Sequence, residues 1–196
     1  MKTYPSSAEE KLGFDVLRAR LAGAVRSSLG EDRLKAMRPT KRLDWLRDEL
    51  QRVAELQEAF RFDDRVPLDH LLDVREVLRQ VKPDAAYVGP EDLLAVRLVA
   101  STARRVKSYF EQRKGKYPTL AQRVERITPL EDLEQHIADI IDEDGAIRDH
   151  ASPELRRLRR LIVQRQAQLR ETLMSELRKA TSSGFATEEQ PTIRNG

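Results

Sequence analysis

The chain has 196 residues, of which 35% are charged and 39% hydrophobic, with a formal net charge of +3. It contains no cysteine, which excludes disulfides, zinc–thiolate sites, iron–sulfur clusters and cysteine nucleophiles. Aromatic residues make up only 5% of the chain, and so high a charged fraction favours amphipathic helices over a thick globular core.

Apolar residues in the first half of the chain recur in steps of three and four, which predicts helices. The predicted helices cover residues 14–25, 40–60 and 74–81. A further short helix is predicted between the first two; Gly30 separates it from the first helix, and Pro39 ends it. The longest of them carries a heptad-like apolar stripe, formed by Leu43, Leu46, Leu50, Val53 and Phe60.

In the second half, Gly89-Pro90-Glu91 opens a helix that should run to about residue 114. Short helices over 120–127 and 130–140 follow, and an acidic segment then leads into a turn at Gly145. Ser152 suits an N-cap and Pro153 the first helical position, so a final helix is predicted over 153–180, roughly 40 Å long.

The predicted fold class is therefore all-α: an antiparallel multi-helix domain with one long, protruding C-terminal helix. Three parts are expected, namely a helical core over 1–152, a lever helix over 153–180, and a linker with a first strand over 181–196. Asn195-Gly196 is the preferred pair for a tight hairpin turn, and Thr192 to Arg194 suit a strand. Since no return strand follows, the chain is expected to be a fragment.

Basic residues dominate the final helix, where eight stand against three glutamates. On a helical wheel of ~100° per residue, Arg156, Arg157, Arg160 and Arg178 point away from the apolar stripe. Two interpretations stay open: the three clustered arginines contact phosphates of nucleic acid, or they pair with the acids of residues 131–149.

A second basic stretch, around Arg104 and Arg105, places Tyr109 among positive charges as a candidate platform for stacking bases. Its neighbour Phe110 lies on an apolar stripe and is predicted to be core. Trp45 is predicted to be a core or inter-helix residue rather than a stacking platform.

No catalytic, cofactor or metal site is predicted. The phosphate-binding motif Gly-x4-Gly-Lys-Ser/Thr is absent from the sequence, and the acidic segment 142–147 does not fit a calcium loop. The three histidines, His70, His136 and His150, match no metal spacing. No apolar run approaches the ~18 residues of a membrane span, and no signal peptide is evident, so a cytoplasmic protein without a membrane partner is expected.

Three stretches carry a family resemblance: residues 10–39 (EKLGFDVLRARLAGAVRSSLGEDRLKAMRP), residues 142–160 (DEDGAIRDHASPELRRLRR), and residues 191–196 (PTIRNG). In order and spacing they resemble the N-terminal helical core and lever of the bacterial MutS-two family, the MutS-like ATPases that carry an Smr nuclease domain.

The resemblance implies a homodimeric parent ATPase and endonuclease that uses ATP and Mg²⁺. It also implies DNA or ribosomal RNA as the nucleic-acid partner, with roles in suppressing recombination and splitting stalled ribosomes. On this hypothesis the chain is not itself an enzyme but positions downstream domains and helps to hold nucleic acid. The alternative is a helical scaffold or dimerisation module with no nucleic-acid contact of its own.

Overall fold

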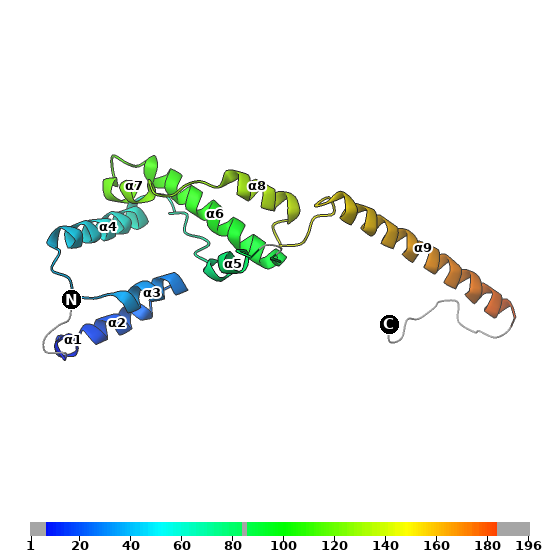
Figure 1. Ribbon diagram of the computed structural model, residues 1–196, viewed down its shortest axis with the longest axis horizontal. Helices are drawn as coiled ribbons and strands as arrows, with labels where there is room; N and C mark the ends of the chain where they lie inside the picture. The colour runs from blue at the N-terminus through cyan, green and yellow to red at the C-terminus, as the bar shows by residue number, and fades with distance from the viewer. Residues whose placement is uncertain (1–6, 84–85, 184–196) are drawn as a thin grey trace. The chain divides into compact units, whose positions relative to one another are not determined.

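The computed structural model describes residues 7–83 and 86–183, and within these ranges every regular element is a helix (Figure 1). The predicted all-α class is confirmed. The helices are α1 (Ala8–Lys11), α2 (Phe14–Ala22), α3 (Ser28–Ala36), α4 (Leu43–Phe62), α5 (Arg75–Gln80), α6 (Pro90–Glu111), α7 (Pro118–Val124), α8 (Glu131–Ile140) and α9 (Pro153–Ser182).

The chain forms two compact units, Met1–Gly145 and Ala146–Gly196, and α9 belongs to the second. The three domains expected from the sequence remain a prediction. Of the segment 181–196, the first two residues continue α9, and residues 184–196, which include the predicted strand and turn, lie outside the described residues.

Most helix starts follow local signals that the sequence displays. Pro90, Pro118 and Pro153 each stand in the first turn of a helix, where a missing N–H leaves no hydrogen bond unmade. The predicted turn at Gly145 is confirmed, because this residue has a φ of 83°, in the left-handed region that suits glycine.

The core of the first unit lies where the C-terminal half of α4 meets α6 and α7. Tyr109 and Phe110 of α6 pack edge to face, with ring centroids 5.0 Å apart, and Phe110 contacts Tyr117 in the same manner at 6.1 Å. Ala59 of α4, Val124 of α7, and Val66 complete this buried cluster. The prediction that Phe110 is a core residue is confirmed.

A carboxylate buried in this core joins α4 to α7. Glu55 is only 3% exposed, and its two oxygens accept hydrogen bonds from the backbone N–H groups of Thr119 (3.2 Å) and Leu120 (2.9 Å). These are donors in the first turn of α7 that have no partner within their own helix. Glu55 therefore caps α7 from another helix, and its negative charge faces the positive end of the α7 dipole.

A second polar cluster fixes the end of α4 to the segment between α6 and α7. The carboxylate of Asp63 accepts hydrogen bonds from Lys116 Nζ (2.7 Å) and from the hydroxyl of buried Tyr117 (2.6 Å). Because both donors stabilise the charged carboxylate, they lower the pKa of Asp63 below its usual value.

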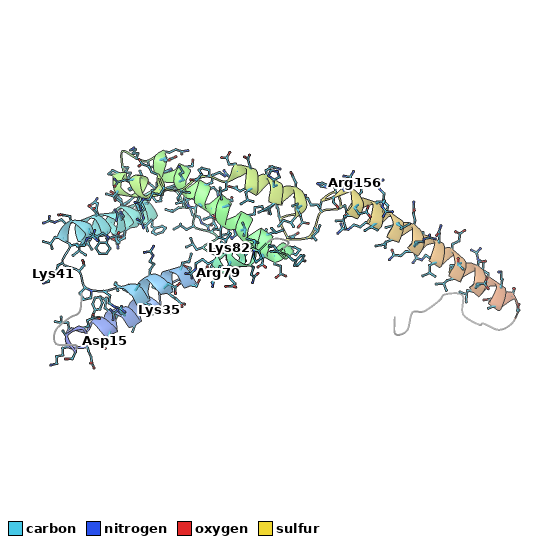
Figure 2. The ribbon with its side chains drawn as sticks, viewed as in Figure 1. Asp15, Lys35, Lys41, Arg79, Lys82 and Arg156 are labelled. Atoms are coloured by element: carbon cyan, nitrogen blue, oxygen red, sulfur yellow. The ribbon has the colours of Figure 1, made fainter. Side chains whose placement is uncertain are left out.

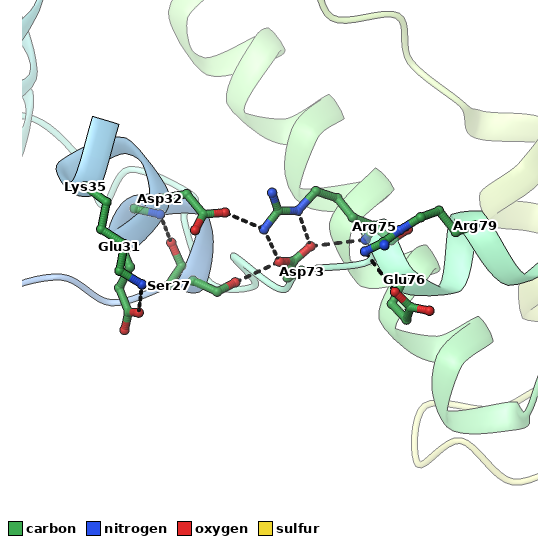
Figure 3. A network of polar contacts seen from close by, with 10 residues as sticks. Ser27, Glu31, Asp32, Lys35, Asp73, Arg75, Glu76 and Arg79 are labelled. Carbon is green, nitrogen blue, oxygen red and sulfur yellow. Dashed lines mark hydrogen bonds and ion pairs between the residues drawn. The ribbon is translucent and has the colours of Figure 1, made fainter. Parts of the chain in front are cut away.

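The N-terminal helices connect to the rest of this unit through Arg75, at the start of α5. Its guanidinium lies between Asp73 (2.5 Å) and Asp32 of α3 (2.7 Å), and Ser28 donates a hydrogen bond to Asp73 at 2.9 Å (Figure 3). Hydrogen bonds from Arg75 are the main cause that lowers the pKa of Asp73.

The heptad-like apolar stripe of α4 does not face this core. Leu50 is 61% exposed, and the rest of the stripe is also open to solvent. With ~100° per residue, Glu55 and Ala59 lie on the opposite side of the helix, and they are the buried residues of α4. A polar contact with α7, rather than the apolar pattern of α4, thus decides which side of this helix is buried.

Replacing Glu55 with alanine should destabilise the first unit, because two buried N–H groups would lose their acceptor. We expect the free energy of unfolding to fall by about 1–3 kcal/mol, measured by urea denaturation. Asp48→Ala, a change at an exposed position of the same helix, is the control and should stay within about 0.5 kcal/mol. Equal effects of the two substitutions would contradict the capping role.

The lowered pKa of Asp63 also predicts a dependence of stability on pH. A carboxyl whose pKa is lower in the folded than in the unfolded chain contributes fully above its unfolded value, about 3.9, and loses that contribution as the pH falls through the folded value. Asp63→Asn should therefore reduce the decline in unfolding free energy between about pH 5 and pH 2. Asp48→Asn is the matched control, and an unchanged decline in Asp63→Asn would refute this assignment.

Candidate nucleic-acid interface

The candidate surface is built on α9, whose start is fixed by a side-chain cap. Ser152 has an extended backbone, and its hydroxyl accepts a hydrogen bond from the N–H of Leu155 at 3.0 Å. This is the geometry expected of a serine N-cap, and it confirms the start of the helix predicted from Ser152-Pro153. The cap orders the first turns of α9, which carry the arginines.

The three predicted phosphate-binding arginines share one surface of α9. Arg156, Arg157 and Arg160 line a shallow depression together with Pro153, Leu161 and Gln164. All three arginines are exposed, and Figure 2 labels Arg156 near the start of the helix. Among the residues that the structure describes, Arg156 and Arg160 have no hydrogen-bond or ion-pair partner for their side chains.

Arg157 differs from its two neighbours because it pairs with Glu154 of the same helix. Its Nη2 and Nε atoms donate to the carboxylate at 2.6 and 3.0 Å. This contact lowers the pKa of Glu154 and raises that of Arg157. Both side chains are largely exposed, so solvent weakens the pair and a phosphate could replace Glu154 as the partner of Arg157.

In the competing interpretation, the arginines of this helix pair with the acids of residues 131–149. This interpretation applies to Arg159 rather than to the three arginines of the candidate surface. Arg159 pairs with Asp149 and also donates to the carbonyl of Ile147 at 3.2 Å. Arg178 is exposed too, but it lies roughly 30 Å farther along the helix. Arg156 and Arg160 therefore form a separate cationic patch, with Arg157 beside them.

The other predicted arginines have structural partners in the first unit. Arg104 of α6 forms a bidentate contact with Glu134 of α8, with Nε–Oε1 and Nη2–Oε2 distances of 3.0 and 2.8 Å, and this contact raises the pKa of Arg104. Arg105 lies 3.3 Å from Asp69. Arg104 thus joins two helices, and neither arginine offers an unpaired charge to a phosphate.

The placement of Tyr109 argues against the stacking role suggested for it. The residue is 8% exposed, and its hydroxyl donates a hydrogen bond to the carbonyl of Asp64 at 3.0 Å. The guanidinium of Arg113 lies 3.9 Å above the ring centroid, and Phe110 packs against the ring. Burial raises the pKa of this phenol. No ring face is left for a base, so Tyr109 acts as a core residue.

A second basic surface escaped the sequence analysis. Four arginines from separate segments border a groove beside Trp45: Arg33, Arg38, Arg42 and Arg123. These arginines come from α3, from the chain before α4 and from α7. No spacing in the sequence could therefore predict that they lie together. Trp45 itself is 43% exposed, so it is not a core residue, and its other predicted role, as an inter-helix residue, stays a prediction.

Among the described residues, no group of three or more His, Cys, Asp or Glu side chains is arranged to hold a metal ion. None of the described helices is long and apolar enough to cross a membrane.

Fold and surface together define a class of protein: a helical domain followed by a long helix that carries a cationic patch of arginines at its capped start. Comparison with known proteins narrows this class. The chain is 29% identical over 187 residues to the Endonuclease MutS2 of Geobacillus sp. (strain WCH70) and 30% identical over 189 residues to that of Pelotomaculum thermopropionicum. It is 27% identical to the Putative endonuclease MutS2 of Bacillus subtilis. No protein-family model matches the chain.

These alignments cover 94–96% of this chain but only 24% of each relative. The chain is homologous to about a quarter of a MutS2 endonuclease, and the resemblance found in the sequence is confirmed.

Proposed function

We propose that this chain is the helical core and lever region of a MutS2-like protein and that its α9 helix contacts the phosphates of nucleic acid. The observation that carries the proposal is the cationic patch of Arg156, Arg157 and Arg160 at the capped start of α9. Arginine suits this role because its planar fork can contact two phosphate oxygens at once.

Such a patch would position nucleic acid without selecting its sequence, since phosphate contacts carry no base information. The proposal therefore covers both DNA and ribosomal RNA. The relatives are named endonucleases, which supports nucleic acid as the partner.

The activities of the whole protein belong to this proposal as well. ATP with Mg²⁺, strand cleavage, a homodimer, and action on branched DNA or stalled ribosomes are what the MutS2 resemblance implies for the parent. The Gly-x4-Gly-Lys-Ser/Thr phosphate loop is absent from this sequence, so the proposal places ATP and Mg²⁺ in other parts of the parent. We assign to this chain the task of positioning the ATPase and nuclease and of holding nucleic acid.

Replacing Arg156, Arg157 and Arg160 together with glutamine should weaken binding to a duplex about equally for different sequences. Each lost phosphate contact should reduce the slope of log affinity against log salt by about 0.9. Fluorescence anisotropy with labelled duplexes at several salt concentrations measures this slope. The unfolding free energy should change little, because the three side chains are exposed.

The matched control removes the same charge from positions farther along α9, outside the patch, with Arg165→Gln, Arg170→Gln and Lys179→Gln. Its salt slope should stay closer to that of the wild type. If both triple variants lose affinity equally, net charge rather than the patch drives binding. An unchanged slope in the first variant would remove α9 from the interface.

A second function is favoured by the exposed stripe of α4, with Leu43, Leu50, Val53 and Phe60 all open to solvent. Its steps of three and four form a seam suited to a facing helix. In an antiparallel pair of two copies, Leu43 would face Phe60 and Leu50 would face Val53, so the stripe is self-complementary. This observation supports a dimerisation module.

If α4 is a dimerisation module, sedimentation velocity should detect association of the wild-type chain as its concentration rises. Leu50→Gln combined with Phe60→Gln should abolish the association, whereas Gln51→Ala on the same helix should not. A wild-type chain that stays monomeric at all concentrations would exclude this role for α4.

A further inference from the structure

The groove beside Trp45 combines an apolar floor with a basic rim inside the first unit. It has a volume of about 870 Å³ and lies between the α2–α3 region, the start of α4, and α7. Leu21, Val25, Leu34 and Met37 supply apolar surface, and Trp45 adds an indole ring. The rim consists of Arg33, Arg38, Arg42 and Arg123, which come from segments far apart in the sequence.

The arginines of this rim are not neutralised. Within the part of the chain that the structure describes, none of the four pairs with a carboxylate, and Arg38 donates only to the carbonyls of Lys35 and Met37. The one acidic residue of the groove, Glu49, is bound by Arg52 at 2.5 Å. Elsewhere in the first unit, Arg75, Arg104 and Arg113 each contact an acid. The groove therefore attracts anions.

The indole ring of Trp45, which is 43% exposed, gives the groove a second property. Bases of a single strand stack on such rings while arginines hold the phosphates, and each stacked base contributes enough to change affinity several-fold. A duplex hides its base faces within its own stack, so it offers phosphates to the rim but no base to Trp45.

We propose that this groove binds single-stranded nucleic acid, with a base stacked on Trp45 and the backbone held by Arg33, Arg42 and Arg123. This site goes beyond the proposed function of α9, since it lies in the other unit and requires an unpaired strand. Charge complementarity between the rim and a phosphate backbone selects this occupant. The carboxylates of an acidic protein segment would pair with the arginines of the rim. Such a segment would leave the indole ring of Trp45 without a ring to stack on it.

The experiment uses the only tryptophan of the chain as its probe. Adding a twelve-nucleotide oligothymidylate should quench the fluorescence of Trp45, and added salt should reverse the quenching. A duplex of equal length should quench much less at equal occupancy. Polyglutamate, as a model acidic segment, should leave the emission unchanged.

Substitutions test the two parts of the site separately by anisotropy of a labelled oligothymidylate. Trp45→Ala should weaken binding by about 5- to 100-fold, whereas Trp45→Phe, which keeps a stacking ring, should recover most of the affinity. Arg33→Gln with Arg42→Gln and Arg123→Gln should lower the salt slope by about 2, at about 0.7 per contact. The charge-matched control is Arg20→Gln with Arg61→Gln and Arg126→Gln, which lie off the groove and should change the slope less.

Several results would overturn the proposal. These are quenching by polyglutamate, an emission spectrum that changes with protein concentration alone, Trp45→Ala binding like the wild type, or equal slopes in the two triple variants. The α9 variant of Arg156, Arg157 and Arg160 separates the two sites, because it should keep the quenching by oligothymidylate. If that variant loses duplex binding but keeps the quenching, the proposed role of α9 is supported and the proposal for the groove is unaffected.

Discussion

The buried carboxylate of Glu55 is the contact on which the arrangement of the first unit depends. It links α4 to the first turn of α7 at the place where α6 contributes Tyr109 and Phe110. Because the acceptor is a charged group in the core, a small rotation of α4 that broke these hydrogen bonds would leave a buried charge unpaired, at a cost of several kcal/mol. The contact therefore fixes which side of α4 faces inward and leaves its apolar stripe outside.

The same principle divides the arginines of the chain into two groups. One group builds the fold, as Arg75 does between α3 and α5 and Arg104 does between α6 and α8, each held by acids at hydrogen-bond distance. Other arginines have no acidic partner among the described residues, and six of them line two surfaces: Arg156 and Arg160 at the start of α9, and Arg33, Arg38, Arg42 and Arg123 at the rim of the Trp45 groove. The arginines that we propose to contact nucleic acid are thus distinct from those that form ion pairs within the fold.

Local signals in the sequence account for the starts of α6, α7 and α9, since Pro90, Pro118, Pro153 and the cap at Ser152 act within one turn. They failed where a tertiary contact overrides a local pattern. The stripe of α4 looked like a packing face, yet Glu55 and Ala59 on the opposite side are the buried residues of this helix, and Trp45 near its start is exposed. The Arg104–Glu134 pair and the groove both join segments distant in sequence, so their roles depend on a packing that no spacing reveals.

Nuclear magnetic resonance of the arginine side chains tests this division most directly. The Nε–Hε signals should be followed while single-stranded and duplex oligonucleotides are added to the ¹⁵N-labelled chain. We predict that Arg156 and Arg160 respond to the duplex, that Arg33, Arg42 and Arg123 respond to the single strand, and that Arg75 and Arg104 do not move. Shifts spread evenly over all of these arginines, or confined to Arg75 and Arg104, would contradict the account.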